Sequence, residues 1–196
     1  MSTGIPGYAY GNRSVEHSPL SWDDFQLLKK TVLFTEQDAH ALQQSGDILK
    51  AQVERVLDVW YGFVGSHPHL LDAFVDRSTG RPDSAYLTAV RRRFGQWILD
   101  TAAANYDQAW LDYQHEIGLR HHRSKKNLTD GTKAAAIVPF RYLVGLTYPV
   151  VATLRPFLEA RGHRASEVEA MQQAWLKSVL LQVILWARPY VRDGDY

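Results

Sequence analysis

Apolar residues recur with a helical period through almost the whole chain after residue 20, and this pattern constrains the fold most. One stripe consists of Val53, Leu57, Trp60 and Val64, which return every three or four residues and share one face of a helix. No segment alternates apolar and polar side chains as a half-buried strand does. The pattern therefore predicts an all-α chain of about eight or nine helices.

The domain organisation follows from where this period begins. Residues 1–20 are rich in glycine and proline and predict an irregular N-terminal extension, whereas residues 21–196 predict one domain with a substantial core. Ser45 and Gly46 predict an interruption early in that domain. Capping residues, glycines and prolines give expected helices at about 21–34, 106–126, 139–161 and 166–190.

Charge and composition exclude several classes of function. The net charge of +1 does not favour binding to nucleic acid or to an anionic membrane. The absence of cysteine excludes thiolate ligation of haem, iron–sulfur clusters and cysteine zinc sites. The N-terminus has no apolar core of a signal peptide, and no apolar run is long enough to span a membrane. We therefore expect a soluble, cytoplasmic protein.

The most distinctive segment contains two adjacent histidines, His121 and His122, near a basic helix end. Adjacent side chains point about 100° apart on a helix, so both do not readily bind one metal ion. His121 lies on the same face as Trp110, Gln114 and Ile117, at the end of an inward stripe. A neutral imidazole in that position suits a five-coordinate haem iron. The alternative from the residues alone is a hydrogen-bonded core histidine.

Two further features each allow a functional interpretation and an ordinary structural one. Tyr61 follows Trp60 on its helix and is placed to present a hydroxyl to a cavity, although both residues also suit an ordinary aromatic core. Arg93 precedes the apolar Phe94 and is placed to pair with a carboxylate at the edge of the buried face, although a surface arginine is the commoner outcome.

Taken together, these motifs resemble the protoglobins, which are single-domain haem proteins related to the sensor domains of globin-coupled sensors. The likeness covers nearly the whole chain in order. It rests on Trp60-Tyr61-Gly62, Arg93-Phe94-Gly95, Trp97–Asp100, Trp110–Gln114, Ile117–Arg123, Arg141–Leu143, Tyr148-Pro149, Trp175 and Pro189-Tyr190.

The resemblance implies a three-over-three globin sandwich with an extra N-terminal helix and a cofactor of haem b. It implies that His121 is the iron ligand and that Arg93 pairs with a haem propionate. It implies that Trp60, Tyr61, Phe94, Leu146 and Val150 line the opposite, distal side. It also implies binding of O2, CO or NO and a homodimer formed through the last two long helices.

The chain departs from the family pattern at two positions. Leu146 stands where the protoglobins compared carry Phe, and Gly145 where they carry Ala. Both changes remove volume and predict a larger distal pocket, with easier entry of ligands larger than O2 or an additional water. The alternatives to simple gas binding are a haem enzyme (NO dioxygenase, peroxidase-like or carbene-transfer) and a gas sensor that acts through a separate partner.

Overall fold

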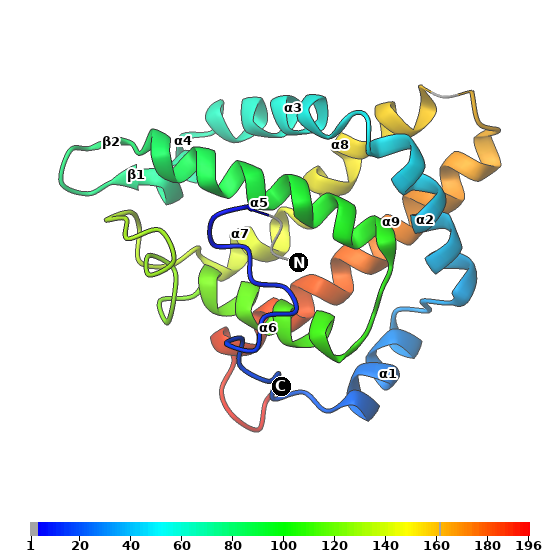
Figure 1. Cartoon of the computed structure of the whole chain (residues 1–196), viewed down its shortest axis with the longest axis horizontal. Helices are drawn as coiled ribbons and strands as arrows, with labels where there is room; N and C mark the ends of the chain where they lie inside the picture. The colour runs from blue at the N-terminus through cyan, green and yellow to red at the C-terminus, as the bar shows by residue number, and fades with distance from the viewer. Residues whose placement is uncertain (1–3, 161) are drawn as a thin grey trace.

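A computed structural model describes residues 4–160 and 162–196 (Figure 1). Its α-helices are α1 (Trp22–Thr31), α2 (Glu36–Leu49), α3 (Val53–Gly65), α4 (Pro68–Leu71), α5 (Ser84–Ala103), α6 (Gln108–His121), α7 (Phe140–Gly145), α8 (Thr147–Glu159) and α9 (Ala165–Ala187). Short 3-10 turns lie at Asp72–Phe74 and Arg188–Tyr190. Two short strands, β1 (Val75–Asp76) and β2 (Arg81–Pro82), pair antiparallel in the loop before α5.

The long helices form the two layers of a globin sandwich. Helices α2, α5 and α6 lie over α3, α8 and α9, with contacts between α2 and α5, α2 and α9, and α6 and α9 across and within the layers. Helix α1 precedes this arrangement as an additional N-terminal helix (Figure 1). The all-α class and the globin-type fold expected from the sequence are confirmed.

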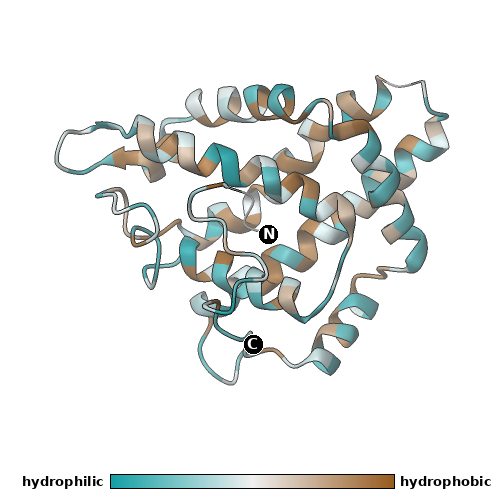
Figure 2. Ribbon diagram, viewed as in Figure 1, coloured by the Kyte–Doolittle hydropathy of each residue, from teal (hydrophilic) through white to brown (hydrophobic). Residues whose placement is uncertain are grey.

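Helix α9 forms the centre of the core. Its residues Met171, Ala174, Trp175 and Leu181 are fully buried. Polar groups in the buried part of this helix are paired, since Gln182 accepts a hydrogen bond from Trp97 and the Trp175 indole donates one to Ser45. Figure 2 shows the same organisation, with apolar colour concentrated on the inner helix faces. A helix that is apolar around most of its circumference belongs largely in the interior.

The expected interruption at Ser45 and Gly46 is wrong, because α2 continues through both residues to Leu49. Ser45 is fully buried and its hydroxyl donates to the Leu42 carbonyl, which a helix allows. Gly46 faces α5, where an added Cβ would lie 3.2 Å from the Cβ of Ala102. The glycine therefore serves close packing of two helices and not a break in one.

Two expected helices are shorter than the sequence indicated. Helix α6 ends at His121 instead of continuing to residue 126, and the amide of Val138 donates to the His121 carbonyl there. The expected helix from Pro139 is divided at Leu146 into α7 and α8. Pro149 lacks the N–H that would bond to the carbonyl four residues earlier, which weakens the helix at this place. The expected end at Arg161 lies outside the described residues.

The last helix begins earlier than its expected capping pair of Ser166 and Glu169. Helix α9 starts at Ala165, and the carboxylate of Glu167 accepts the backbone N–H of Arg164 at 2.9 Å. Glu169 instead pairs with Arg155 of α8. The capping role therefore falls to the acidic residue two positions earlier.

The N-terminal segment crosses from α5 to α6 (Figure 1). The Tyr8 hydroxyl donates to Asp100 of α5 at 2.7 Å, and the Tyr10 ring stacks on Tyr113 of α6 with centroids 5.6 Å apart. These contacts place irregular chain over the space between the two helices. Across the residues that the structure describes, no helix is both long and apolar enough to cross a membrane.

Candidate functional site

Helix α6 delivers His121 to the interior with a fixed ring orientation. Asp107 caps the start of the helix, since its carboxylate accepts the Trp110 N–H, and His121 is the final residue of the helix. The Nδ1 atom of His121 lies 2.8 Å from the Ile117 carbonyl oxygen. Because a carbonyl only accepts, Nδ1 carries the proton and Nε2 keeps a free lone pair. Burial lowers the pKa of His121 to about 4, so the ring is neutral near pH 7.

A second contact from α9 holds the same ring. The indole of Trp186 stacks on His121 with centroids 5.3 Å apart and planes inclined by 15°. Trp186 in turn donates from Nε1 to the Gln114 side-chain oxygen at 2.9 Å. Gly118 permits this close approach, since an added Cβ would lie 2.9 Å from the Trp186 Cα. Sequence reasoning missed Trp186 and Gly118, because a tryptophan in a core helix and a mid-helix glycine carry no separate signal.

His122 points elsewhere. Its Nδ1 lies 2.8 Å from the Ser124 hydroxyl, and its ring meets Tyr190 edge-on at 5.1 Å. Its backbone has already left the helix and is extended. The two adjacent histidines therefore occupy different surroundings, and in the described part of the chain only His121 stacks on an indole of α9.

A second wall of the candidate site gathers the predicted distal residues from α3, α5 and the α7–α8 junction. Trp60 is buried and its ring lies 5.7 Å from that of Phe94. The side chains of Tyr61, Leu146 and Val150 pack against the same cluster. These five residues come from segments far apart in the sequence, yet the fold brings all of them together.

The Tyr61 hydroxyl is the notable polar atom of this wall. Within residues 4–160 and 162–196, no hydrogen-bond partner lies within reach of it, although the side chain is largely enclosed. Burial raises the pKa of Tyr61, so the phenol keeps its proton. A phenol in this state is a donor without an acceptor.

A continuous series of rings connects the two walls. The ring of Phe94 lies 5.1 Å from Trp97, and Trp97 lies 6.1 Å from Trp186, the residue stacked on His121. At one end of this series of rings lies His121, whose Nε2 has a free lone pair. Near the other end lies Tyr61, whose hydroxyl has no hydrogen-bond partner among the described residues. These residues fit a flat, apolar macrocycle whose metal needs one nitrogen ligand.

Arg93 has a different observed partner from the one expected of it. Its guanidinium makes two hydrogen bonds to the Asp130 carboxylate, at 3.0 and 2.6 Å, and one to the Pro6 carbonyl oxygen. These contacts join α5 to the loop after α6 and to the N-terminal segment. Its role toward a haem propionate stays a prediction.

A small apolar cavity of about 200 Å³ adjoins the distal cluster. It is lined by Phe63, Leu70, Tyr142, Gly145, Leu146 and Pro149, with His67 and His69 at its rim. An added Cβ at Gly145 would meet no atom within 4 Å. The two positions that depart from the family pattern thus border real empty space.

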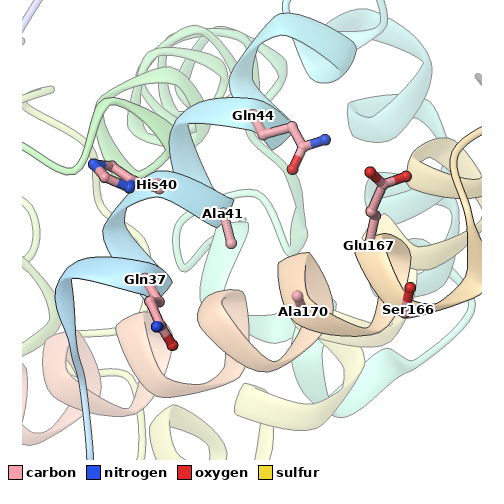
Figure 3. A pocket seen from close by; sticks show the side chains of 7 residues that line it. All are labelled: Gln37, His40, Ala41, Gln44, Ser166, Glu167 and Ala170. Atoms are coloured by element: carbon pink, nitrogen blue, oxygen red, sulfur yellow. The ribbon is translucent and has the colours of Figure 1, made fainter.

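A second hollow lies between α2 and α9, away from these residues (Figure 3). The small side chains of Ala41 and Ala170 form its floor, and polar side chains such as Gln37 and Glu167 surround it. None of the predicted site residues lines it.

Comparison with known proteins decides the family. The sequence model of the Protoglobin family matches residues 22–196. The chain belongs to the protoglobin family. A solved globin domain of the Geobacter sulfurreducens globin-coupled sensor has the same fold, with a TM-score of 0.64 at 16% identity, and the match covers 85% of this chain and 97% of that one. No curated protein matches the sequence. Membership of this globin family implies haem binding and a haem-based function in gas binding or sensing.

Proposed function

We propose that this protoglobin binds one haem b through His121 and reversibly binds O2, CO or NO on the side of Tyr61. The observation that carries the proposal is the His121 imidazole, which is neutral, held through Nδ1 by the Ile117 carbonyl and free at Nε2. A histidine that ligates a metal through one nitrogen almost always donates its other N–H to such an acceptor. When bound, haem supplies an iron whose sixth position takes a diatomic gas.

The distal residues contribute selectivity. Trp60, Phe94, Leu146 and Val150 provide an apolar surface that disfavours water. Tyr61 supplies one hydrogen-bond donor within that surface, and O2, which would gain negative charge from the haem iron, would accept a hydrogen bond better than CO would. We therefore expect Tyr61 to favour O2 relative to CO.

Optical spectra test the proposal directly. The purified protein, supplied with haem, is expected to show an intense Soret band in the ferric, ferrous and CO-bound states, with one haem per chain. A protein that takes up no haem, or whose ferrous state does not respond to CO, would contradict it. Repeated consumption of NO by the oxygenated protein would instead assign an enzyme.

We further propose that the protein forms a homodimer through α7, α8 and α9. The side chains of Phe140, Val144 and Tyr148 are exposed and recur at intervals of four residues, and Leu180 of α9 is exposed as well. An apolar stripe of this kind disfavours a monomer in water. Sedimentation equilibrium is expected to give twice the chain mass, and Val144→Glu is expected to give the monomer. A monomeric wild-type protein would contradict the dimer.

A further inference from the structure

A buried lysine lies near the proposed haem site, and the described part of the chain provides no counter-ion in contact with it. The Lys126 side chain belongs to the loop after α6, and the residue is only 6% exposed. Its Nζ donates to the Tyr86 hydroxyl at 2.6 Å and to the Ala73 carbonyl at 3.2 Å. Over the described residues, no carboxylate lies within 4.0 Å of it. Asp130, which acts on it through its charge, is already paired with Arg93.

Lys126 and Tyr86 together have more donors than acceptors. An ammonium group has three N–H donors, and two of them are used here. Tyr86 is also 6% exposed, and its oxygen accepts from Lys126. The tyrosine's own O–H proton therefore needs an acceptor, and the described part of the chain supplies none. An anion with two oxygens would satisfy both groups.

The energetic cost of burying the Lys126 charge also indicates an anionic ligand. A buried charge without a partner is unfavourable, and burial lowers the pKa of Lys126 to about 8. A hydrophobic residue would occupy the position at lower cost if the lysine served only to fill space. The position of the charge is therefore best explained by a ligand that carries the opposite charge.

The location of the pair identifies that ligand. Lys126 follows the proposed iron ligand, His121, by five residues. Tyr86 lies eight residues before Phe94 on α5, which places both on one helix face. The Tyr86 ring also packs on Phe74, which contacts the cluster around Trp60. Lys126 is near enough to His121 for its charge to lower the pKa of that imidazole, and Tyr86 is near enough to Tyr61 to raise the pKa of that phenol. The pair therefore lies close to both groups of proposed site residues.

We propose that Lys126 and Tyr86 bind a carboxylate of a haem propionate, which rests on haem binding as proposed above. The Lys126 ammonium supplies the charge and one donor, and the Tyr86 hydroxyl supplies a second donor. Arg93 then has a distinct task, because its pairing with Asp130 holds the loop that carries Lys126 against α5.

Haem loss from the ferric holoprotein to an excess of a haem-scavenging apoglobin tests the assignment. Lys126→Met removes the charge and keeps an unbranched side chain, and Tyr86→Phe removes only the hydroxyl. Each is expected to speed haem loss about tenfold, the size of one charge-assisted hydrogen bond. The control is Lys133→Met, which alters an exposed lysine of the same loop and is expected to leave the rate unchanged.

Haem dimethyl ester separates a carboxylate contact from a structural role. Its propionates carry no charge, so wild-type, Lys126→Met and Tyr86→Phe proteins loaded with it are expected to lose it at similar rates. Variants that lose both forms of haem faster by the same factor would overturn the proposal, as would variants that lose native haem at the wild-type rate. If Lys126→Met does not fold, Tyr86→Phe decides the result. A normal CO-bound spectrum in each variant shows that the iron site itself is intact.

Discussion

The two walls of the proposed haem site differ in how their polar atoms are satisfied. On the α6 side, the His121 ring is fixed by the Ile117 carbonyl and by stacking on Trp186, and Trp186 is itself bonded to Gln114. On the α3 side, the Tyr61 hydroxyl has no partner in the described structure. A cavity of about 200 Å³ adjoins the residues around it.

The side chains of the two walls are therefore held in place to different degrees. A metal ligand loses affinity when its ring is free to turn, so a wall proposed to hold the iron benefits from redundant contacts. A wall that receives a small exchangeable molecule needs an unpaired donor and free volume instead. The comparison predicts that substitutions on the α6 side alter haem retention and stability, whereas those on the α3 side alter gas binding.

The largest effect is expected when the proposed iron ligand is removed. His121→Gly deletes the nitrogen that the fold holds in place, so haem affinity is expected to fall strongly and the ferrous spectrum to change. His122→Ala is the matched control, because His122 bonds to Ser124 and lies beside Tyr190. Ferrous and CO-bound spectra measure both. An unchanged ferrous spectrum in His121→Gly would show that the ligand is wrong and make His122 the next candidate.

The contact of α6 with α9 is the next most sensitive feature. In Gly118→Ala the new Cβ would lie 2.9 Å from the Trp186 backbone, so the helices must separate. Overpacking of this kind costs about 1–3 kcal/mol, and we expect a lower melting temperature of the ferric holoprotein together with faster haem loss.

Gly145→Ala is the matched control for that prediction. The added methyl group there would meet no atom within 4 Å. The melting temperature is therefore expected to stay the same or to rise slightly, because alanine favours a helix more than glycine does. Equal destabilisation by both substitutions would show that the α6–α9 contact is not special.

Helical periodicity made the overall fold predictable, because it depends on local spacing. The predicted stripe that contains Trp60 became the buried face of α3. The expected break at Gly46 was wrong because the role of this glycine depends on a distant contact and not on local spacing. Whether a glycine ends a helix or permits close packing depends on what faces it, and Ala102 lies 56 residues farther along the chain.

The site could be predicted from the sequence only in part. Resemblance to a family supplied His121 and the proposed distal residues, and the latter pack into one cluster although they come from distant segments. The sequence did not indicate Trp186, Tyr86 or Lys126, because each acts through a contact with a distant segment. Lys126 lay within a basic run that also suited a solvent-exposed helix end, and only its burial distinguishes it.

On the α3 side, removal of the Tyr61 hydroxyl is expected to have an intermediate effect. Tyr61→Phe keeps the ring and deletes the unpaired donor, so the O2 dissociation rate is expected to rise about tenfold, as for one hydrogen bond of about 1.4 kcal/mol. The CO dissociation rate is expected to change little, since CO is a weaker acceptor. Stopped-flow ligand exchange measures both rates. Equal changes for the two gases would assign the effect to packing rather than to the donor.

The smallest effect is expected at Leu146, whose side chain lines the cavity and also packs against the distal cluster. Leu146→Phe adds volume toward that space and restores the residue typical of the family. Association of a bulky isocyanide with the ferrous protein is expected to slow about threefold, which corresponds to about 0.6 kcal/mol. Association of O2 is expected to stay nearly constant, because a diatomic molecule needs less room. Leu128→Phe is the control, since Leu128 is 74% exposed. If Leu146→Phe slows O2 and the isocyanide alike, the substitution acts on the whole distal wall and the cavity is not the feature that distinguishes ligands by size.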